Sequence, residues 1–239
     1  MVASVRGWGA NYESWLIEHG ELWGDTAFDF VWGTLAELLQ KSWGDWRIAR
    51  MFVDSGFKPE STRGSDNQIY DFCRRFRAVA FPTKGHDRQD KPLKASMIDV
   101  SHRGRTIKNG VQLWHLDSDY FKSWVHSRVR WPAGESGAWH LHRDTTDDYC
   151  QQVVAEQRLL MATGRITWIK TAVDNHYLDC EALNAAAAHS LSIHTLRPIQ
   201  VKKECEKEEP QQEAKPNPPP QRKPIVPRRP GNFVNRFNR

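Results

Sequence analysis

Residues 175–184 read Asn-His-Tyr-Leu-Asp-Cys-Glu-Ala-Leu-Asn and continue into four alanines at 185–188. An apolar, strand-like run at 166–169 precedes them, and Asn175 is a residue type that often caps a helix, so we expect a helix to begin there. At helical spacing Asp179 shares a face with Ala182, Leu183 and Ala186, the small apolar face expected to pack on a sheet. A carboxylate on such a face is costly unless a positive charge meets it.

A second acid lies in a similar position earlier in the chain. Residues 48–53 are typical of a buried strand, which ends in Asp54, Ser55 and Gly56. An acid at the end of a strand and another in the first turn of a later helix can converge on a divalent cation, and this pair is our hypothesis. Two alternatives remain open, since Asp54 could simply form a turn and Asp179 could simply favour the helix dipole.

The other segments predict an α/β domain. Residues 1–6 and 14–17 flank a turn and indicate a β-hairpin. Thr26 and Asp29 have capping-box spacing at the start of a helix whose apolar stripe, including Trp32, predicts core packing and not base stacking. We further expect a helix at 66–76, a strand at 78–81 closed by residues 82–85, a strand at 111–116, and helices at 118–129 and 147–163.

This order of elements is that of a ribonuclease-H-like nuclease fold without its first strand. Residues 86–170 then form an insertion before the last helix, within a domain that spans residues 1–200. From residue 201 the composition changes, and eight of the 13 prolines lie in residues 210–230. No core can form from such a sequence, so we expect residues 201–239 to be a disordered, Pro-rich tail.

Charge and cysteine usage limit the remaining possibilities. Residues 201–239 contain ten Lys and Arg against five Glu, so they carry the whole net charge of +5 and the body is near neutral. The four cysteines are widely separated, which indicates free thiols in a reducing compartment. The sequence contains neither a run of about 18 apolar residues nor a signal peptide at its start, and we expect a soluble intracellular protein without a membrane partner.

Several ordered motifs resemble the nuclease domain of the large terminase subunit of lambda-type tailed bacteriophages. The similarity extends from Arg6 to about Ser190, and its most specific part is residues 175–180. The other matching motifs are Arg6-Gly7-Trp8-Gly9 with residues 13–17, Val53-Asp54-Ser55-Gly56, residues 69–73, residues 82–85, Asp119 with Lys122, and Ala155-Glu156.

The resemblance implies a function and a set of partners. Members cut concatemeric viral DNA at packaging boundaries, and the match implies that Asp54 and Asp179 are catalytic, metal-binding acids. Two Mg²⁺ or Mn²⁺ ions would suit both the oxygen ligands and phosphodiester hydrolysis. Double-stranded phage DNA, the terminase small subunit and the portal or procapsid are the implied partners, in the host cytoplasm.

Two departures from the family pattern affect this expectation. The family's first catalytic acid lies on a strand before the hairpin, and its packaging ATPase also precedes it. The chain has no GxxxxGK[ST] motif. We therefore expect a C-terminal piece whose ATPase half and first acid lie upstream. The alternative is a catalytically inactive module that binds DNA or docks on the portal or procapsid.

Other polar residues allow both a functional and a structural interpretation. Asp117 and Asp119 favour helix capping or solvation, and Glu156 is interpreted as a surface helix acid. His140, His142 and Cys150 fit no standard zinc spacing. Basic residues that could follow the DNA backbone, or form an ordinary solvated face, are Arg74, Arg75, Lys84, Arg103, Arg105 and Lys108.

Overall fold

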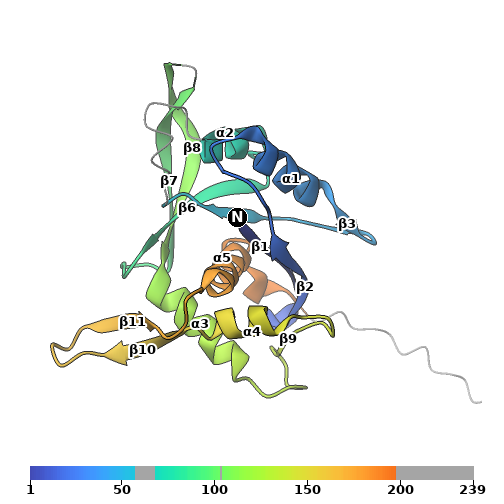
Figure 1. Ribbon diagram of the computed structural model, residues 1–239, viewed down its shortest axis with the longest axis vertical. Helices are drawn as coiled ribbons and strands as arrows, with labels where there is room; N and C mark the ends of the chain where they lie inside the picture. The colour runs from blue at the N-terminus through green and yellow to red at the C-terminus, as the bar shows by residue number, and fades with distance from the viewer. Residues whose placement is uncertain (57–67, 103, 198–239) are drawn as a thin grey trace, which may run out of the picture. The chain divides into compact units, whose positions relative to one another are not determined.

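The main sheet of the computed structural model has four strands in the order β5-β6-β8-β7 (Figure 1). Strands β5, β6 and β8 are parallel, and β7 runs antiparallel to β8 at the outer edge. The bounds are Met51–Asp54 (β5), Ala80–His86 (β6), Leu93–His102 (β7) and Arg105–Asp117 (β8). The prediction that residues 82–85 close a strand is wrong, because β6 continues through them in register with β8. Strands β7 and β8 extend the sheet with residues expected to belong to an insertion.

The structure describes residues 1–56, 68–102 and 104–197, which lie in a unit that spans Met1–Ile199. Residues 200–239 make up a second unit. The predicted tail from residue 201 and the basic residue Arg103 therefore lie outside the described residues. Among the residues that are described, no helix has the length and apolar character needed to cross a membrane.

The predicted N-terminal hairpin is confirmed and is longer than expected. Strand β1 (Val2–Trp8) pairs antiparallel with β2 (Ser14–Glu21), and a short 3₁₀ turn, η1 (Ala10–Tyr12), lies between them. The two-residue strand β9 (Trp139–His140) adds to β2 in parallel and completes a three-stranded sheet. A separate small hairpin joins β3 (Ser42–Trp43) to β4 (Trp46–Arg47).

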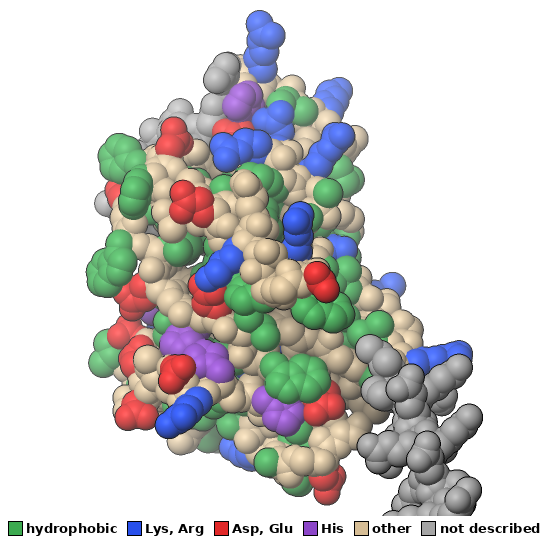
Figure 2. Space-filling model, turned by 90° about the vertical axis from the view of Figure 1, so that its right-hand side faces the viewer, with side chains coloured by type: hydrophobic (Ala, Val, Ile, Leu, Met, Phe, Trp, Pro, Cys, Tyr) green, Lys and Arg blue, Asp and Glu red, His purple; other side chains and the backbone are tan. Residues whose placement is uncertain are grey.

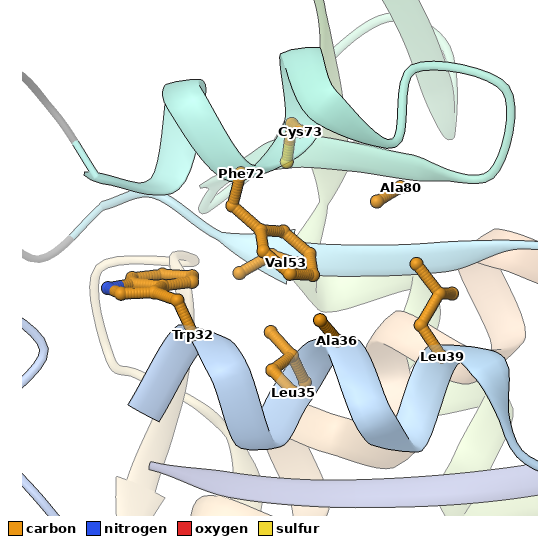
Figure 3. Packing of buried hydrophobic residues seen from close by; sticks show 8 residues of the cluster. All are labelled: Trp32, Leu35, Ala36, Leu39, Val53, Phe72, Cys73 and Ala80. Atoms are coloured by element: carbon orange, nitrogen blue, oxygen red, sulfur yellow. The ribbon is translucent and has the colours of Figure 1, made fainter. Parts of the chain in front are cut away.

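Helices α1 (Asp29–Gln40) and α2 (Gln68–Arg75) enclose the first hydrophobic cluster. The predicted capping box at Thr26 is wrong, because α1 begins at Asp29 after Phe28 and has no side-chain cap. Figure 3 shows the cluster between α1, α2 and β5. Trp32 packs within it as predicted, together with Leu35, Ala36, Leu39, Val53, Phe72, Cys73 and Ala80.

The region from residue 118 to residue 170 contains two helices and a hairpin. Helix α3 (Ser118–Val129) is confirmed, with the Asp117 carboxylate accepting a hydrogen bond from the Tyr120 backbone N–H at 2.8 Å. The predicted helix at 147–163 is wrong beyond its first turns. Helix α4 (Asp147–Val153) ends there, and β10 (Glu156–Leu160) pairs antiparallel with β11 (Ile166–Lys170). A strand at 166–169 needs a partner for its backbone groups, and β10 supplies it.

Helix α5 (His176–Ser190) connects the two larger sheets, and the short 3₁₀ turn η3 (Ile193–Thr195) follows it. Ala182, Ala185 and Ala186 pack with Leu116 of β8 and Phe121 of α3, and the small side chains allow this close approach. Tyr177 and Leu178 pack in a second cluster with residues of β2, α3 and α4. The first turn of α5 is therefore held from several sides, which fixes the position of Asp179.

Candidate active site

Asp54 lies at the carboxyl end of β5, where the neighbouring strand fixes the backbone. The buried Ser55 donates from its backbone N–H and its hydroxyl to the Thr83 carbonyl of β6, at 2.8 and 2.7 Å. Thr83 donates its own hydroxyl to the Val53 carbonyl at 3.1 Å. The Asp54 side chain is exposed, and one carboxylate oxygen accepts the Gly56 N–H at 2.9 Å. The predicted turn role is thus present, and the other carboxylate oxygen has no hydrogen-bond partner among the described residues.

Asp179 lies in the first turn of α5, as predicted, but not on a sealed apolar face. Its side chain is 50% exposed, and its carboxylate forms an ion pair with Lys122 of α3 at 2.9 Å. Asn175, the residue before the helix, donates from Nδ2 to the second Asp179 oxygen at 3.2 Å. The Asn175 side chain does not cap the helix. The side-chain amide oxygen of Gln152 accepts a hydrogen bond from the Tyr177 backbone N–H at 3.3 Å.

Glu156 is the clearest correction to the predicted site residues. It was interpreted as a surface helix acid, but it is buried at the start of β10. Lys122 Nζ donates to both of its carboxylate oxygens at 2.9 Å, and Asn175 Nδ2 donates to one of them. Burial would lower the pKa of the Lys122 ammonium, but the charges of Asp179 and Glu156 outweigh it and the pKa is raised. Lys122 therefore stays charged between two carboxylates.

Asp54 and Asp179 are both part of the wall of one cavity of about 980 Å³. Strand β1, strand β5 and the first turns of α5 contribute to that wall. Cys180, which follows Asp179, also lines this cavity. Burial, and then the negative charges of Glu181, Asp179 and Asp54, raise the pKa of its thiol. That the two acids converge on one cation stays a prediction.

The acid that is fully buried on α5 is Glu181, which was not singled out from the sequence. Its side chain is 1% exposed and pairs with the buried guanidinium of Arg6 at 2.6 Å. Ser4 and Tyr149 donate hydroxyl hydrogen bonds to its other oxygen, at 3.1 and 2.8 Å. Burial, and then the charge of Glu181, raise the pKa of the Tyr149 hydroxyl. The Arg6–Glu181 pair attaches the N-terminal hairpin to α5 and is a structural feature.

The basic residues predicted to follow DNA fall into two groups. Arg74 and Arg75 end α2, and Arg105 and Lys108 lie near the tip of the β7–β8 hairpin. Asp71 bridges these elements, since its Oδ1 accepts from Arg74 at 3.2 Å and lies 2.8 Å from His102 Nδ1. In Figure 2, Lys and Arg side chains gather toward the upper end of the Met1–Ile199 unit, the end where Figure 1 shows the tip of β7 and β8.

Lys84 lies at the other end of the sheet. It follows Thr83, the register partner of Asp54, so it is near the carboxyl end of β5. At about 3.3 Å per residue, nine positions along β8 separate Lys108 from Asp117 by roughly 30 Å. The structure therefore places Lys84 at the same end of the sheet as Asp54, with its side chain on the opposite face, and places the other four predicted residues toward the far end.

Asp117 and Asp119 have structural partners. Asp117 caps α3 and also accepts the Gln89 backbone N–H at 2.9 Å. Asp119 accepts two hydrogen bonds from Arg158, at 2.7 and 2.9 Å, and one from the Trp168 indole at 2.9 Å. The hydrogen bond from Arg158 is the main reason that the pKa of Asp119 is lowered. The interpretation of Asp117 as a helix cap is confirmed, and Asp119 attaches the β10–β11 hairpin to α3.

The donor atoms of the cavity are of the type that divalent Mg²⁺ and Mn²⁺ prefer. Asp54 and Asp179 offer hard carboxylate oxygens, which suit these ions better than thiol or imidazole ligands. Within the described ranges, however, no group of three or more His, Cys, Asp and Glu side chains is arranged to hold a metal ion. Two acids on one cavity wall fit part of such a site.

Comparison with known proteins gives one family. The family model described as the terminase large subunit gpA endonuclease domain matches residues 1–201. Neither the search of curated proteins nor the search of solved structures gives a match. The matched residues include every described element of the chain, among them β5 with Asp54 and α5 with Asp179.

Proposed function

Because this chain belongs to the family of the terminase large subunit gpA endonuclease domain, we propose that it is a metal-dependent endonuclease that cuts concatemeric viral DNA for packaging. The observation that carries this proposal is the position of Asp54 and Asp179 on the wall of one cavity. The two residues come from β5 and α5, 125 positions apart in the sequence. The Ser55–Thr83 hydrogen bonds hold the strand end that carries one acid, and the fixed first turn of α5 holds the other.

Asp54 and Asp179 are the residues that would hold divalent cations. Mg²⁺ or Mn²⁺ bound there would lower the pKa of an attacking water and stabilise charge on the leaving oxygen. Lys122 contributes by orienting Asp179 and Glu156, because its ammonium contacts both carboxylates. Asn175 Nδ2 donates to the same two acids.

We propose that the complete fold is ribonuclease-H-like, with a further strand between β1 and β5. Among the described strands, β1 pairs only with β2, and β5 pairs only with β6. The unpaired edges of β1 and β5 both contribute to the cavity wall, and unpaired edges favour strand addition. The family resemblance implies that such a strand carries another acid, which would supply the third ligand that the described residues lack.

The metal proposal predicts a thermal shift with Mn²⁺. At a Mn²⁺ concentration 100 times the Kd, binding to the folded state stabilises it by about 2.7 kcal/mol, which corresponds to roughly 5–10 °C in Tm for a domain of this size. Asp54→Asn and Asp179→Asn should each abolish the shift, because each removes a charged ligand. Asp174→Asn, at an exposed acid before α5, is the matched control and should retain it. If both site variants keep the wild-type shift, the cation binds elsewhere.

We also propose that the tail from residue 201 docks on the portal or procapsid. Its composition supports this, since it is rich in proline and its last part, from Arg222 to Arg239, has basic residues but no acids. Deletion of residues 201–239 should leave the Tm of the domain unchanged within error and should weaken capture by purified procapsids. A large decrease in Tm on deletion would show instead that the tail is part of the folded domain.

A further inference from the structure

A row of basic side chains crosses three strands of the main sheet close to its carboxyl end. Lys84 of β6 is the register partner of His115 of β8, and Lys94 of β7 is the register partner of the same histidine. Register partners on adjacent strands project from the same face of a sheet. Lys84 and Lys94 are exposed and His115 is half-buried, so the row is open to solvent.

A chain of hydrogen bonds fixes the middle of this row. His86 Nε2 lies 2.9 Å from His115 Nδ1, and His115 Nε2 lies 2.9 Å from the Ser96 hydroxyl. His86 and Ser96 are each two residues along their strands from Lys84 and Lys94, so they share the same face. Both ring nitrogens of His115 are therefore occupied, and the imidazole has a defined orientation.

The row places two lysine charges on either side of His115, and among the described residues only Lys94 has an ion-pair partner. Like charges on directly opposed strand residues destabilise a sheet, so a proton on His115, which is opposite both lysines, is unfavourable. Burial, and then the proximity of His86, Lys84 and Lys94, lower the pKa of His115. The partner of Lys94 is the carboxylate of Asp90. An anion bound across the row would relieve this repulsion.

We propose that Lys84, Lys94 and the His86–His115 pair form a shelf that binds successive phosphates of the DNA backbone. The inference rests on the proposed function, which requires a DNA substrate. Lys84 and Lys94 are two interstrand spacings apart, about 10 Å, so the row is longer than one phosphate group and suits an extended polyanion. Lys84 follows Thr83, the register partner of Asp54, so the shelf is level with the end of β5 but lies on the face of the sheet opposite Asp54.

The test is the binding of a fluorescein-labelled DNA duplex by the full chain in EDTA, measured by anisotropy over a range of salt concentrations. Each phosphate contact contributes about 0.9 to the slope of log K against log salt. Lys84→Gln and Lys94→Gln should each reduce the slope by about this amount and weaken binding roughly five- to tenfold at 0.1 M salt. Lys170→Gln, at an exposed lysine on β11, is the control of equal charge and should change neither quantity.

The histidine pair adds a pH dependence with a definite sign. His115 is mostly neutral at pH 7 because its pKa is lowered, and a bound phosphate favours its protonated form. Binding should therefore strengthen from pH 8 to pH 6, the range in which histidine titrates. His115→Gln should reduce this change. The groups that face His115 are His86, Lys84, Lys94 and Ser96.

The outcomes separate this inference from the function on which it rests. If the wild-type chain binds DNA and the shelf variants bind it as Lys170→Gln does, the shelf is overturned and the endonuclease proposal stays intact. Absence of any salt-dependent DNA binding by the wild-type chain would overturn both. An unchanged Tm in Lys84→Gln and Lys94→Gln, measured alongside, shows that a loss of affinity does not come from unfolding.

Discussion

Replacement of Glu181 by glutamine should lower the free energy of unfolding by about 3–5 kcal/mol, the usual cost of leaving one member of a buried ion pair without its partner. In a domain of this size the expected decrease in Tm is roughly 6–20 °C. The Arg6 guanidinium would remain buried beside a neutral amide. It contacts the Ser14 hydroxyl, the His140 carbonyl and the Tyr149 hydroxyl at 3.2–3.3 Å, but none of these carries a compensating charge.

Two further variants separate this effect from a general loss of charge. Glu18→Gln removes an ion pair with Lys41 in which both side chains are well exposed, and such pairs contribute at most about 1 kcal/mol. The double variant Arg6→Met with Glu181→Leu replaces both charges by apolar groups and should recover much of the lost stability. The measurement is thermal or urea unfolding. Equal Tm values for Glu181→Gln and Glu18→Gln would contradict the structural role assigned to the buried pair.

The positions of Asp54 and Asp179 could be predicted because each depends on local sequence. A buried strand that ends in Asp-Ser-Gly places the first acid at a sheet edge, and a helix start at Asn175 places the second in the first turn. The sequence indicates that a carboxylate on this face needs a positive partner, but it does not indicate that the partner is Lys122. That lysine lies on α3, 57 residues earlier in the chain, and it draws the carboxylate toward itself.

Glu181 and Glu156 had no comparable local signal. The partner of Glu181 is Arg6, 175 residues away in sequence, and helical periodicity cannot indicate a charge that meets the helix from so distant a segment. Glu156 was assigned to a helix because the segment after Asp147 begins as one. The single available clue was the strand-like run at 166–169, which needed an antiparallel partner. β10 is that partner, and it begins at Glu156.

The second large effect concerns catalysis and follows from the pair of acids. If Asp54 and Asp179 hold the same metal centre, loss of either should reduce DNA nicking by at least about a hundredfold, because a bound cation contributes several kcal/mol to transition-state stabilisation. The double variant should then be no slower than either single variant, as expected for residues that act as one unit.

Nicking by the wild-type chain itself should be slow, since the described residues supply two acids and not a complete two-metal site. A deficit of about 4 kcal/mol corresponds to roughly a thousandfold in rate.

The most direct measurement is the rate at which supercoiled plasmid is converted to its nicked form in Mn²⁺, with a parallel reaction in EDTA. It should be made for the wild-type chain, Asp54→Asn, Asp179→Asn, their double variant and the control Asp174→Asn. We predict that the wild type and the control nick the plasmid slowly and only in Mn²⁺. The two single site variants and their double variant should show no nicking above the EDTA level. Nicking that continues at the wild-type rate in Asp54→Asn and Asp179→Asn would contradict the assignment of these two acids as the metal-binding centre of an endonuclease.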